Sequence, residues 1–241
     1  MEKQLNITAI KEYLLSQIKG SGWDKEFFFY LKSEDLDKIF FKIREEIEEE
    51  DVNITPKLKY LFKPFKLCPT KKVKVVILYP EPTPLIFKSD GMALSSEEEF
   101  ERGMKFFQEE INRTVYGGKN KKTSFNLDYL ATQGVLLLNL TPTARLMVRN
   151  SHTELWKEYT QLVMDILVRK YSKCIFVIMG DRCDKFTKEL IKPSRKITYF
   201  KTTDPYNAPA GGVRKPVWDS GDLFNKINEK LASKRKKPIA W

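Results

Sequence analysis

The sequence predicts an α/β protein whose parallel sheet is covered by helices on both faces. Four short segments are apolar almost throughout and rich in β-branched residues, which is typical of buried strands. Segments with helical periodicity separate them, and this alternation favours parallel pairing. The chain has 241 residues, 41% of them hydrophobic, which is enough for one substantial core. The predicted strands are residues 73–78, 134–139, 174–179 and 197–200.

The remaining elements are predicted as helices. Residues 1–50 carry apolar side chains at helical spacing, including Ile10, Leu14 and Ile18. The acidic run at 45–51 is interpreted as a solvated helix end, and the basic run at 234–237 as a solvated tail rather than a localisation signal. Further helices are predicted at 97–112, 154–170, 183–191 and 223–231.

One domain is expected over residues 1–241, with residues 1–22 as an N-terminal helical extension. The sequence shows no internal repeat and no low-complexity linker. In parallel α/β sheets, ligands bind beyond the carboxyl ends of the strands. We therefore expect a site in four loops, at 79–90, 140–152, 180–184 and 201–212.

Composition narrows the classes of function. Lys and Arg number 43 against 32 Asp and Glu, and the net charge of +11 favours a polyanionic partner such as nucleic acid. The cysteines Cys68, Cys174 and Cys183 are odd in number, so we expect no disulfides. They lack the spacing of a zinc site and only one histidine is present, so we expect no metal, and no other cofactor is expected. No apolar run approaches the ~20 residues that span a bilayer. A cytoplasmic protein is expected, associated with the nucleoid if it is bacterial.

Several motifs carry a family resemblance. Residues 130–139 read LATQGVLLLN and are followed by Ser151-His152, Trp156 and Tyr159-Thr160. This pattern is similar to WAxQGVLLLN, SH, W and FT of family 1 uracil-DNA glycosylases. Further similarity lies at 73–78 and 175–180, at 54–57 and 61–65, and at the terminal PIAW, which resembles PIDW. The resemblance covers about residues 23–241. It implies a three-layer α/β/α sandwich with a four-stranded parallel sheet, acting on DNA as a monomer without metal.

The first catalytic motif departs from the family pattern. Where the family has GQDPYH, this chain has YPEPTP at 79–84. The resemblance places Glu81 at the aspartate that activates water, beside Pro82. Thr83 stands where a tyrosine blocks C5 substituents, and Leu94 where a phenylalanine stacks on the flipped base. Both changes remove aromatic volume from the implied base pocket.

The last motif departs further. Where the family has HPSPLS, this chain has DPYNAP at 204–209. Asp204 therefore replaces the histidine that donates to O2 of the leaving base, and Ala208 replaces the leucine wedge. After the third strand, Gly180-Asp181 replaces the phosphate-clamping Gly-Ser, and the added carboxylate repels a phosphate.

Three residues are candidates for the chemistry. The Asn139 amide offers a donor and an acceptor to a pyrimidine edge, although an asparagine at a strand end can also cap a turn. Glu81 is able to accept a proton from water or stabilise a cationic sugar, or is a solvated surface residue. An ionised Asp204 has no proton to donate, so it is either protonated or accepts from an amino group. Losing an oxyanion donor costs about 10²- to 10³-fold in rate, so uracil excision is expected to be weak or absent.

DNA contact is expected to come largely from phosphates. His152 is interpreted as structural or phosphate-contacting, with proton transfer as the alternative. Tyr79, Tyr206 and Trp218 are candidates for stacking or for packing in the core. The other predicted DNA-contacting residues are Ser151, Gly180, Lys88, Arg145, Arg149, Arg182, Arg214 and Lys215.

Two functions from different classes follow. The leading hypothesis is a DNA glycosylase for a bulky C5-substituted pyrimidine in single- or double-stranded DNA, acting in base excision or in a phage-related role. The alternative is a catalytically inactive DNA-binding protein on the same scaffold. A metal held by Glu81 and Asp204 is disfavoured, since two carboxylates alone are a poor site.

Overall fold

Four parallel strands form the central sheet of the computed structural model, which describes residues 6–83, 89–97, 102–119, 124–188, 197–207 and 218–241. The strand order is β3-β2-β5-β6. The register pairs Val75 with both Val135 and Ile175, so β3, β2 and β5 start level. The strands are β2 (Val75–Tyr79), β3 (Val135–Asn139), β5 (Ile175–Met179) and β6 (Thr198–Thr202).

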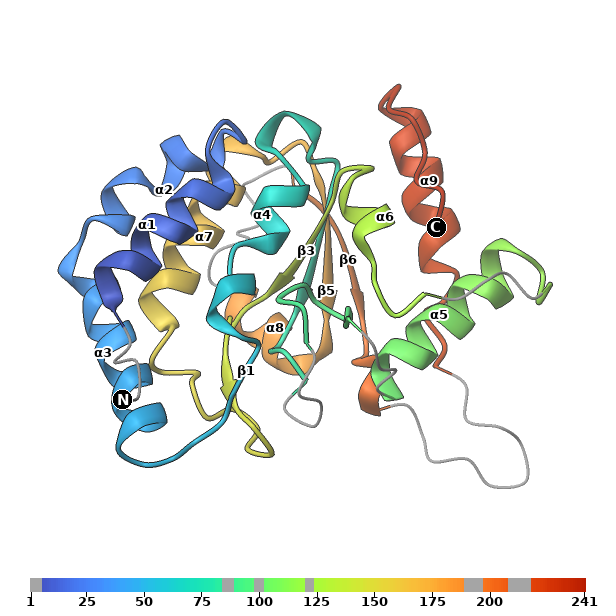
Figure 1. Cartoon of the computed structure of the whole chain (residues 1–241). Coiled ribbons are helices and arrows are strands. Elements are labelled where there is room, and N and C mark those ends of the chain that lie inside the picture. Colours follow the sequence, from blue (N-terminus) through green and yellow to red (C-terminus); the bar gives the residue numbers. More distant parts are fainter. Residues whose placement is uncertain (1–5, 84–88, 98–101, 120–123, 189–196, 208–217) are drawn as a thin grey trace.

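Helices cover both faces of the sheet, which gives three layers (Figure 1). One face is covered by α1 (Ile7–Ile18), α2 (Trp23–Leu31), α3 (Glu34–Glu48), α4 (Lys63–Leu67), α7 (Lys157–Lys170) and α8 (Gly180–Lys188). The other face is covered by α5 (Arg102–Val115), α6 (Asp128–Ala131) and α9 (Leu223–Ser233). The α/β/α sandwich predicted from the sequence is confirmed.

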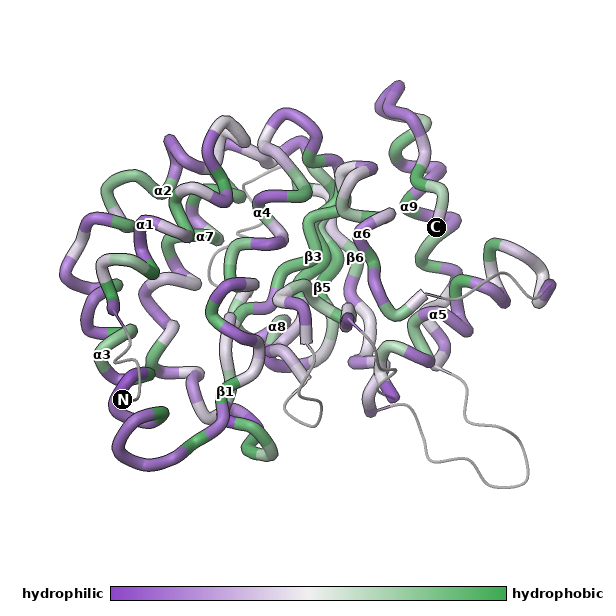
Figure 2. The backbone as a smooth tube through the Cα atoms, in the orientation of Figure 1, coloured by the Kyte–Doolittle hydropathy of each residue, from purple (hydrophilic) through white to green (hydrophobic). Residues whose placement is uncertain are grey.

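Alternation along the strands divides the core in two. Successive side chains of a strand point to opposite faces, so Val76 and Leu78 pack with the first set of helices, while Val75 and Ile77 pack with the second. The apolar residues are concentrated in these strands and the helix sides that face them (Figure 2). Tyr79 belongs to the second cluster. Asn139, two residues after Leu137 on β3, points to that same face.

Short elements brace the carboxyl end of the sheet. β1 (Ile54–Thr55) pairs antiparallel with β4 (Ala144–Arg145), which ties the segment after α3 to the loop after β3. Three 3-10 turns complete the described structure: η1 (Leu58–Tyr60), η2 (Thr70–Lys72) and η3 (Pro205–Asn207). The pairing with β1 therefore fixes residues 144–145 of the loop after β3.

The structure corrects three sequence interpretations. The segment 180–184 is not a loop, because α8 begins directly at Gly180. The acidic run at 45–51 is not all solvated, because Glu46 is buried and binds Arg145 and His152. β6 is an edge strand with half-exposed and exposed residues rather than an apolar one. In each case a tertiary contact, or its absence at the sheet edge, decides the outcome.

The N-terminal helix packs into the body of the protein. Ile7, Leu14 and Ile18 of α1 are buried in the first core cluster with residues of α2, α3 and α7. None of the described helices is long and apolar enough to span a membrane.

Candidate active site

The ends of β2 and β3 lie side by side at the carboxyl edge of the sheet. Tyr79 is the register partner of Asn139. Pairing continues past both strands, because Leu140 N donates to Tyr79 O at 2.8 Å and Thr141 N to Pro80 O at 3.1 Å. The two loops that leave this edge are thus held together from their first residues, which brings Glu81 next to the segment that begins at Thr141.

Glu81 is buried, with an exposed fraction of 6%, in a polar environment. Its Oε2 accepts a hydrogen bond from Asn150 N at 2.8 Å and lies 3.5 Å from Arg182 Nη1. No described residue donates to Oε1. One carboxylate oxygen is therefore fixed by the protein, and the other is left for water or substrate.

Arg182 holds the loops around Glu81 together. Its Nη2 donates to Thr141 Oγ1 at 2.6 Å and also to Thr153 Oγ1, and its Nη1 donates to Asn150 Oδ1. Arg182 thus joins α8 to the loop between β3 and α7 while it faces Glu81. The sequence pointed to Arg182 as a DNA contact and missed this bracing role, which depends on residues 29 to 41 positions away.

Asn139 is buried with half of its amide satisfied. Its Nδ2 donates to Gly91 O at 3.4 Å, a long hydrogen bond, whereas its buried Oδ1 accepts none from the described residues. Buried polar atoms without partners are uncommon in folded proteins and are worth an explanation. The orientation set by Gly91 leaves an acceptor that suits an N–H group on the edge of a pyrimidine.

The segment that carries Gly91 and Leu94 is anchored by a buried aspartate. Asp90 accepts from Met92 N at 3.1 Å and Ser95 Oγ at 2.8 Å, and it pairs with Lys63 at 2.8 Å. Burial raises the pKa of Asp90, although Lys63 and Ser95 oppose that shift. Asp90 and Lys63 were not among the residues predicted from the sequence to belong to the site. A charged residue within an apolar and small-residue stretch, DGMALSS, was the available signal.

The predicted pocket residues Pro82, Thr83 and Leu94 are all buried near this edge. Leu94 has a φ of 59°, a left-handed conformation that is uncommon for a branched side chain and is found where the surrounding structure imposes it. Residues 84–88, which follow Thr83 in the sequence, lie outside the described residues. Whether Glu81 and Asn139 share one cavity stays a prediction, since each is bonded to a different loop.

Asp204 lies at the opposite end of the same edge, after β6. It is buried, and its Oδ1 accepts from Tyr79 Oη and from Tyr206 N, both at 2.9 Å. Burial raises the pKa of Asp204, while the two donors and the charge of Arg149 act against that shift. Glu81 and Asp204 share no contact with each other among the described residues, and no described cluster of carboxylates, His and Cys would hold a metal ion.

Glycine is required at position 180. Its φ is 80°, and a Cβ built there would lie 3.2 Å from Asp204 Cβ. Next to it, the Arg149 guanidinium stacks on the Tyr206 ring at 3.9 Å. Arg149 is exposed, and its contact with a phosphate stays a prediction. Trp218 instead packs in the second core cluster, with Nε1 donating to Thr203 O.

His152 belongs to a buried network. One ring nitrogen contacts Thr143 Oγ1 at 2.7 Å and the other Glu46 Oε2 at 2.8 Å, and Trp156 Nε1 donates to the same threonine oxygen. Burial lowers the pKa of His152, with Glu46 opposing the shift. Its exposed fraction is 1%, so a phosphate contact by the ring would require a rearrangement.

The neighbouring predicted DNA contacts are also engaged. Arg145 pairs with Glu46 at 2.8 Å and Glu50 at 3.2 Å, and Ser151 Oγ accepts from Arg145 N. Their contact with DNA stays a prediction. Lys88, Ala208, Arg214 and Lys215 lie outside the described residues.

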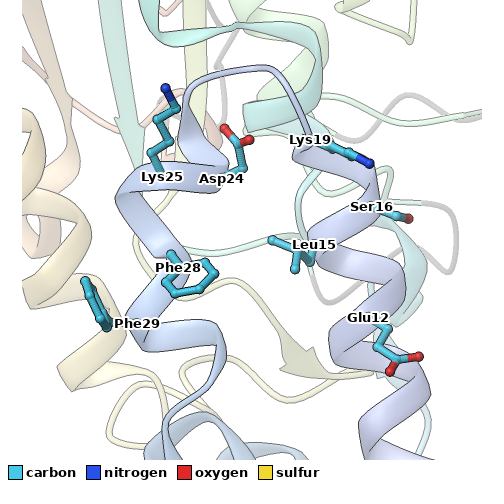
Figure 3. A pocket seen from close by; sticks show the side chains of 8 residues that line it. All are labelled: Glu12, Leu15, Ser16, Lys19, Asp24, Lys25, Phe28 and Phe29. Carbon is cyan, nitrogen blue, oxygen red and sulfur yellow. The ribbon is translucent and has the colours of Figure 1, made fainter.

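Two surface hollows lie away from this edge. Figure 3 shows the groove between α1 and α2, about 620 Å³ in volume, where Leu15, Phe28 and Phe29 lie among charged side chains. A second hollow, of about 410 Å³, is bordered by Lys71, Lys72 and Lys74 and by Lys236 and Lys237. The latter lies at the amino-terminal end of β2, so part of the positive charge is remote from Glu81 and Asn139.

Comparisons with known proteins give a consistent result. A uracil-DNA glycosylase of Clostridium beijerinckii is 30% identical over 239 residues, which cover 94% of this chain and 98% of that protein. One of Mesomycoplasma hyopneumoniae is 26% identical over 225 residues, covering 90% and 96%. The crystal structure of mimivirus uracil-DNA glycosylase superposes with a TM-score of 0.79 at 22% identity, covering 99% of this chain and 90% of that one. No protein-family model matches the chain.

Proposed function

The chain belongs to the uracil-DNA glycosylase family, and from that premise we propose that it excises a pyrimidine with a bulky C5 substituent from DNA. The proposed reaction is hydrolysis of the N-glycosidic bond after the nucleotide is rotated out of the stack. The biological setting is base excision, or defence against phage whose DNA carries modified pyrimidines. The enzyme class, a DNA glycosylase, agrees with the names of its relatives.

The observation that carries the proposal is the buried Oδ1 of Asn139, which accepts no hydrogen bond from the described residues. A flipped pyrimidine supplies the missing donor, either N3–H of a uracil or the 4-amino group of a cytosine. The base gains a hydrogen bond, and the protein loses a buried unsatisfied atom that costs about 1–3 kcal/mol. The hydrogen bond that Asn139 Oδ1 lacks in the free protein thus supports recognition of the pyrimidine edge.

Glu81 supplies the carboxylate for bond cleavage. Its Oε2 is held by Asn150 N, so Oε1 is free to accept a proton from the attacking water or to face the cationic sugar. Arg182, 3.5 Å from Oε2, keeps the carboxylate in place through the threonines that it also binds. The DNA backbone is met by Arg149 and by the basic residues at 214 and 215.

The preference for a C5 substituent rests on two side chains. Thr83 stands where the resemblance implies the tyrosine that blocks C5 substituents, and Leu94 where it implies the phenylalanine that stacks on the base, so the pocket loses aromatic volume at the C5 edge and over the ring face. Asp204 stands where the resemblance implies the histidine that donates to O2, and an ionised Asp204, which has no proton to donate, would cost about 10²- to 10³-fold on uracil.

Excision assays test the proposal directly. Wild type, Glu81→Ala and Asn139→Ala are incubated with DNA duplexes and single strands, and abasic sites are cleaved with alkali. The substrates carry uracil, 5-hydroxymethylcytosine, glucosylated 5-hydroxymethylcytosine or a 5-substituted uracil. We expect product from a C5-substituted base with wild type alone. Release of uracil and of no other base contradicts the substrate proposal.

A second candidate is a catalytically silent DNA-binding protein. The contact of Tyr79 with Asp204 favours it, because the phenol lies at the edge where a base would enter. In that case none of the substrates yields product, and Glu81→Ala and Asn139→Ala bind DNA as wild type does. An Arg149→Ala variant serves as the positive control for weakened binding.

A further inference from the structure

Tyr79 connects two ends of the sheet that are not neighbours. It is the last residue of β2, Asp204 follows β6, and β5 lies between these strands. Tyr79 Oη nevertheless donates to Asp204 Oδ1 at 2.9 Å. β5 leads directly into Gly180, where a built Cβ would lie 3.2 Å from Asp204 Cβ. The phenol therefore reaches past the end of β5 to the acid that replaces the family's histidine.

The hydrogen bonds on Asp204 are one-sided. Tyr79 Oη and Tyr206 N both donate to Oδ1, and no described residue donates to Oδ2. The oxygens of an ionised carboxylate are equivalent acceptors, whereas a neutral acid has one carbonyl oxygen that accepts and one hydroxyl that donates. Two donors on Oδ1 fit that oxygen as the carbonyl and leave Oδ2 as the hydroxyl.

The surroundings of Asp204 favour the neutral form. The side chain is 8% exposed, and burial is the largest cause of its raised pKa. Among the described residues, the groups that face it are the Tyr79 phenol, Tyr206 N of its own loop, Cys183 of α8 and the more distant Arg149. Burial raises the pKa of the Cys183 thiol as well. Arg149 stacks on the Tyr206 ring instead of pairing with the acid.

We propose that Asp204 acts as a neutral carboxylic acid whose Oδ2–H donates a hydrogen bond to O2 of the departing pyrimidine, with Tyr79 as its positioning residue. The inference rests on the proposed glycosylase function. As the C1′–N1 bond breaks, its electron pair leaves on the base and spreads to O2, where the acid proton stabilises it. Water adds to C1′ and gives its proton to Glu81. Asp204 keeps its own proton throughout.

The first test needs no substrate. Protein labelled with ¹³C at the aspartate carboxyls is titrated from pH 3.5 to 8, and the Asp204 signal is assigned by its loss in Asp204→Asn. We expect its titration midpoint above that of the surface aspartates and above the pH at which base release is greatest; a midpoint below that pH contradicts the inference. Tyr79→Phe removes a donor that favours the charged form, so the midpoint rises further, while the matched change Tyr199→Phe on exposed β6 leaves it in place. An Asp204 signal that titrates with the surface aspartates overturns the inference.

The second test uses base release from the duplex panel between pH 5 and 9. Asp204→Asn keeps an N–H donor that does not titrate, so activity persists and the decline at high pH due to Asp204 disappears. Asp204→Ala loses about 10²- to 10³-fold at every pH. Full activity of Asp204→Ala contradicts the donor role. If Asp204 titrates like the surface aspartates and base release is intact, only this inference is wrong. If Asp204 is neutral and no duplex releases a base, both the donor role and the glycosylase function are wrong.

Discussion

The buried Glu46 network offers the sharpest test of how the site is supported, through the substitution Glu46→Gln. Glu46 Oε1 accepts from Arg145 at 2.8 Å and Oε2 contacts His152 Nε2 at 2.8 Å. Hydrogen bonds to charged groups contribute about 1.5–3 kcal/mol each. Arg145 is 31% exposed, so water replaces part of its bond, and glutamine retains one acceptor. We expect a loss of about 2–3 kcal/mol in the free energy of unfolding.

That loss is large enough to measure by two methods. For a domain of this size, 1 kcal/mol corresponds to roughly 2–4 °C in Tm, so Glu46→Gln is expected to lower Tm by about 4–12 °C. Circular dichroism against temperature and against urea at pH 7.5 gives both quantities. Glu49→Gln is the matched control, since Glu49 is exposed in the same acidic run. Equal stability of the two variants would refute the assignment of Glu46 as a structural acid.

Three further outcomes follow from the site. Arg182→Met removes the cation beside Glu81 and three hydrogen bonds, to Asn150, Thr141 and Thr153. Base release is therefore expected to fall at least about 10-fold. DNA affinity, measured by fluorescence anisotropy, is expected to change less than in Arg149→Ala. Gly180→Ala places a Cβ against Asp204 at a φ of 80° and lowers stability by about 1–3 kcal/mol in urea unfolding. The free energy of unfolding is expected to fall as pH drops below 6.5, because the pKa of His152 is lowered in the folded protein and the unfolded chain takes up the proton first. In urea titrations between pH 7 and 5, His152→Gln is expected to reduce this dependence of the unfolding free energy on pH.

Most of the fold could be predicted from the hydrophobic pattern of the sequence. The predicted strands at 73–78, 134–139 and 174–179 match β2, β3 and β5 to within two residues, because a parallel strand covered on both faces must be apolar on both. β3 and β6 are both edge strands, but β3 is buried throughout, whereas Thr198, Phe200 and Thr202 of β6 are only half-buried. The strands could thus be identified from the sequence, whereas their exposure depended on how the rest of the fold covers each one.

Residue types alone did not show how the site is supported. Glu81 and Asn139 were predicted from motif position, and both lie at the expected edge. Their partners, Asn150 N and Gly91 O, are backbone groups 69 and 48 residues away, and backbone groups leave no signature in a sequence. For the same reason Arg182 was predicted to face DNA, although its guanidinium is turned inward to Glu81 and two threonines.

The sequence by itself determined the parallel α/β architecture, the excess of positive charge and the replacement of a donor histidine by Asp204. These follow from local pattern and residue chemistry, which do not depend on how distant segments meet. Only the tertiary structure decided that Glu46 is buried, that Tyr79 reaches Asp204 past β5 and that Asn139 has a free acceptor. The physical reason is that hydrogen-bond partners and burial are set by through-space distance, which the order of residues along the chain does not fix.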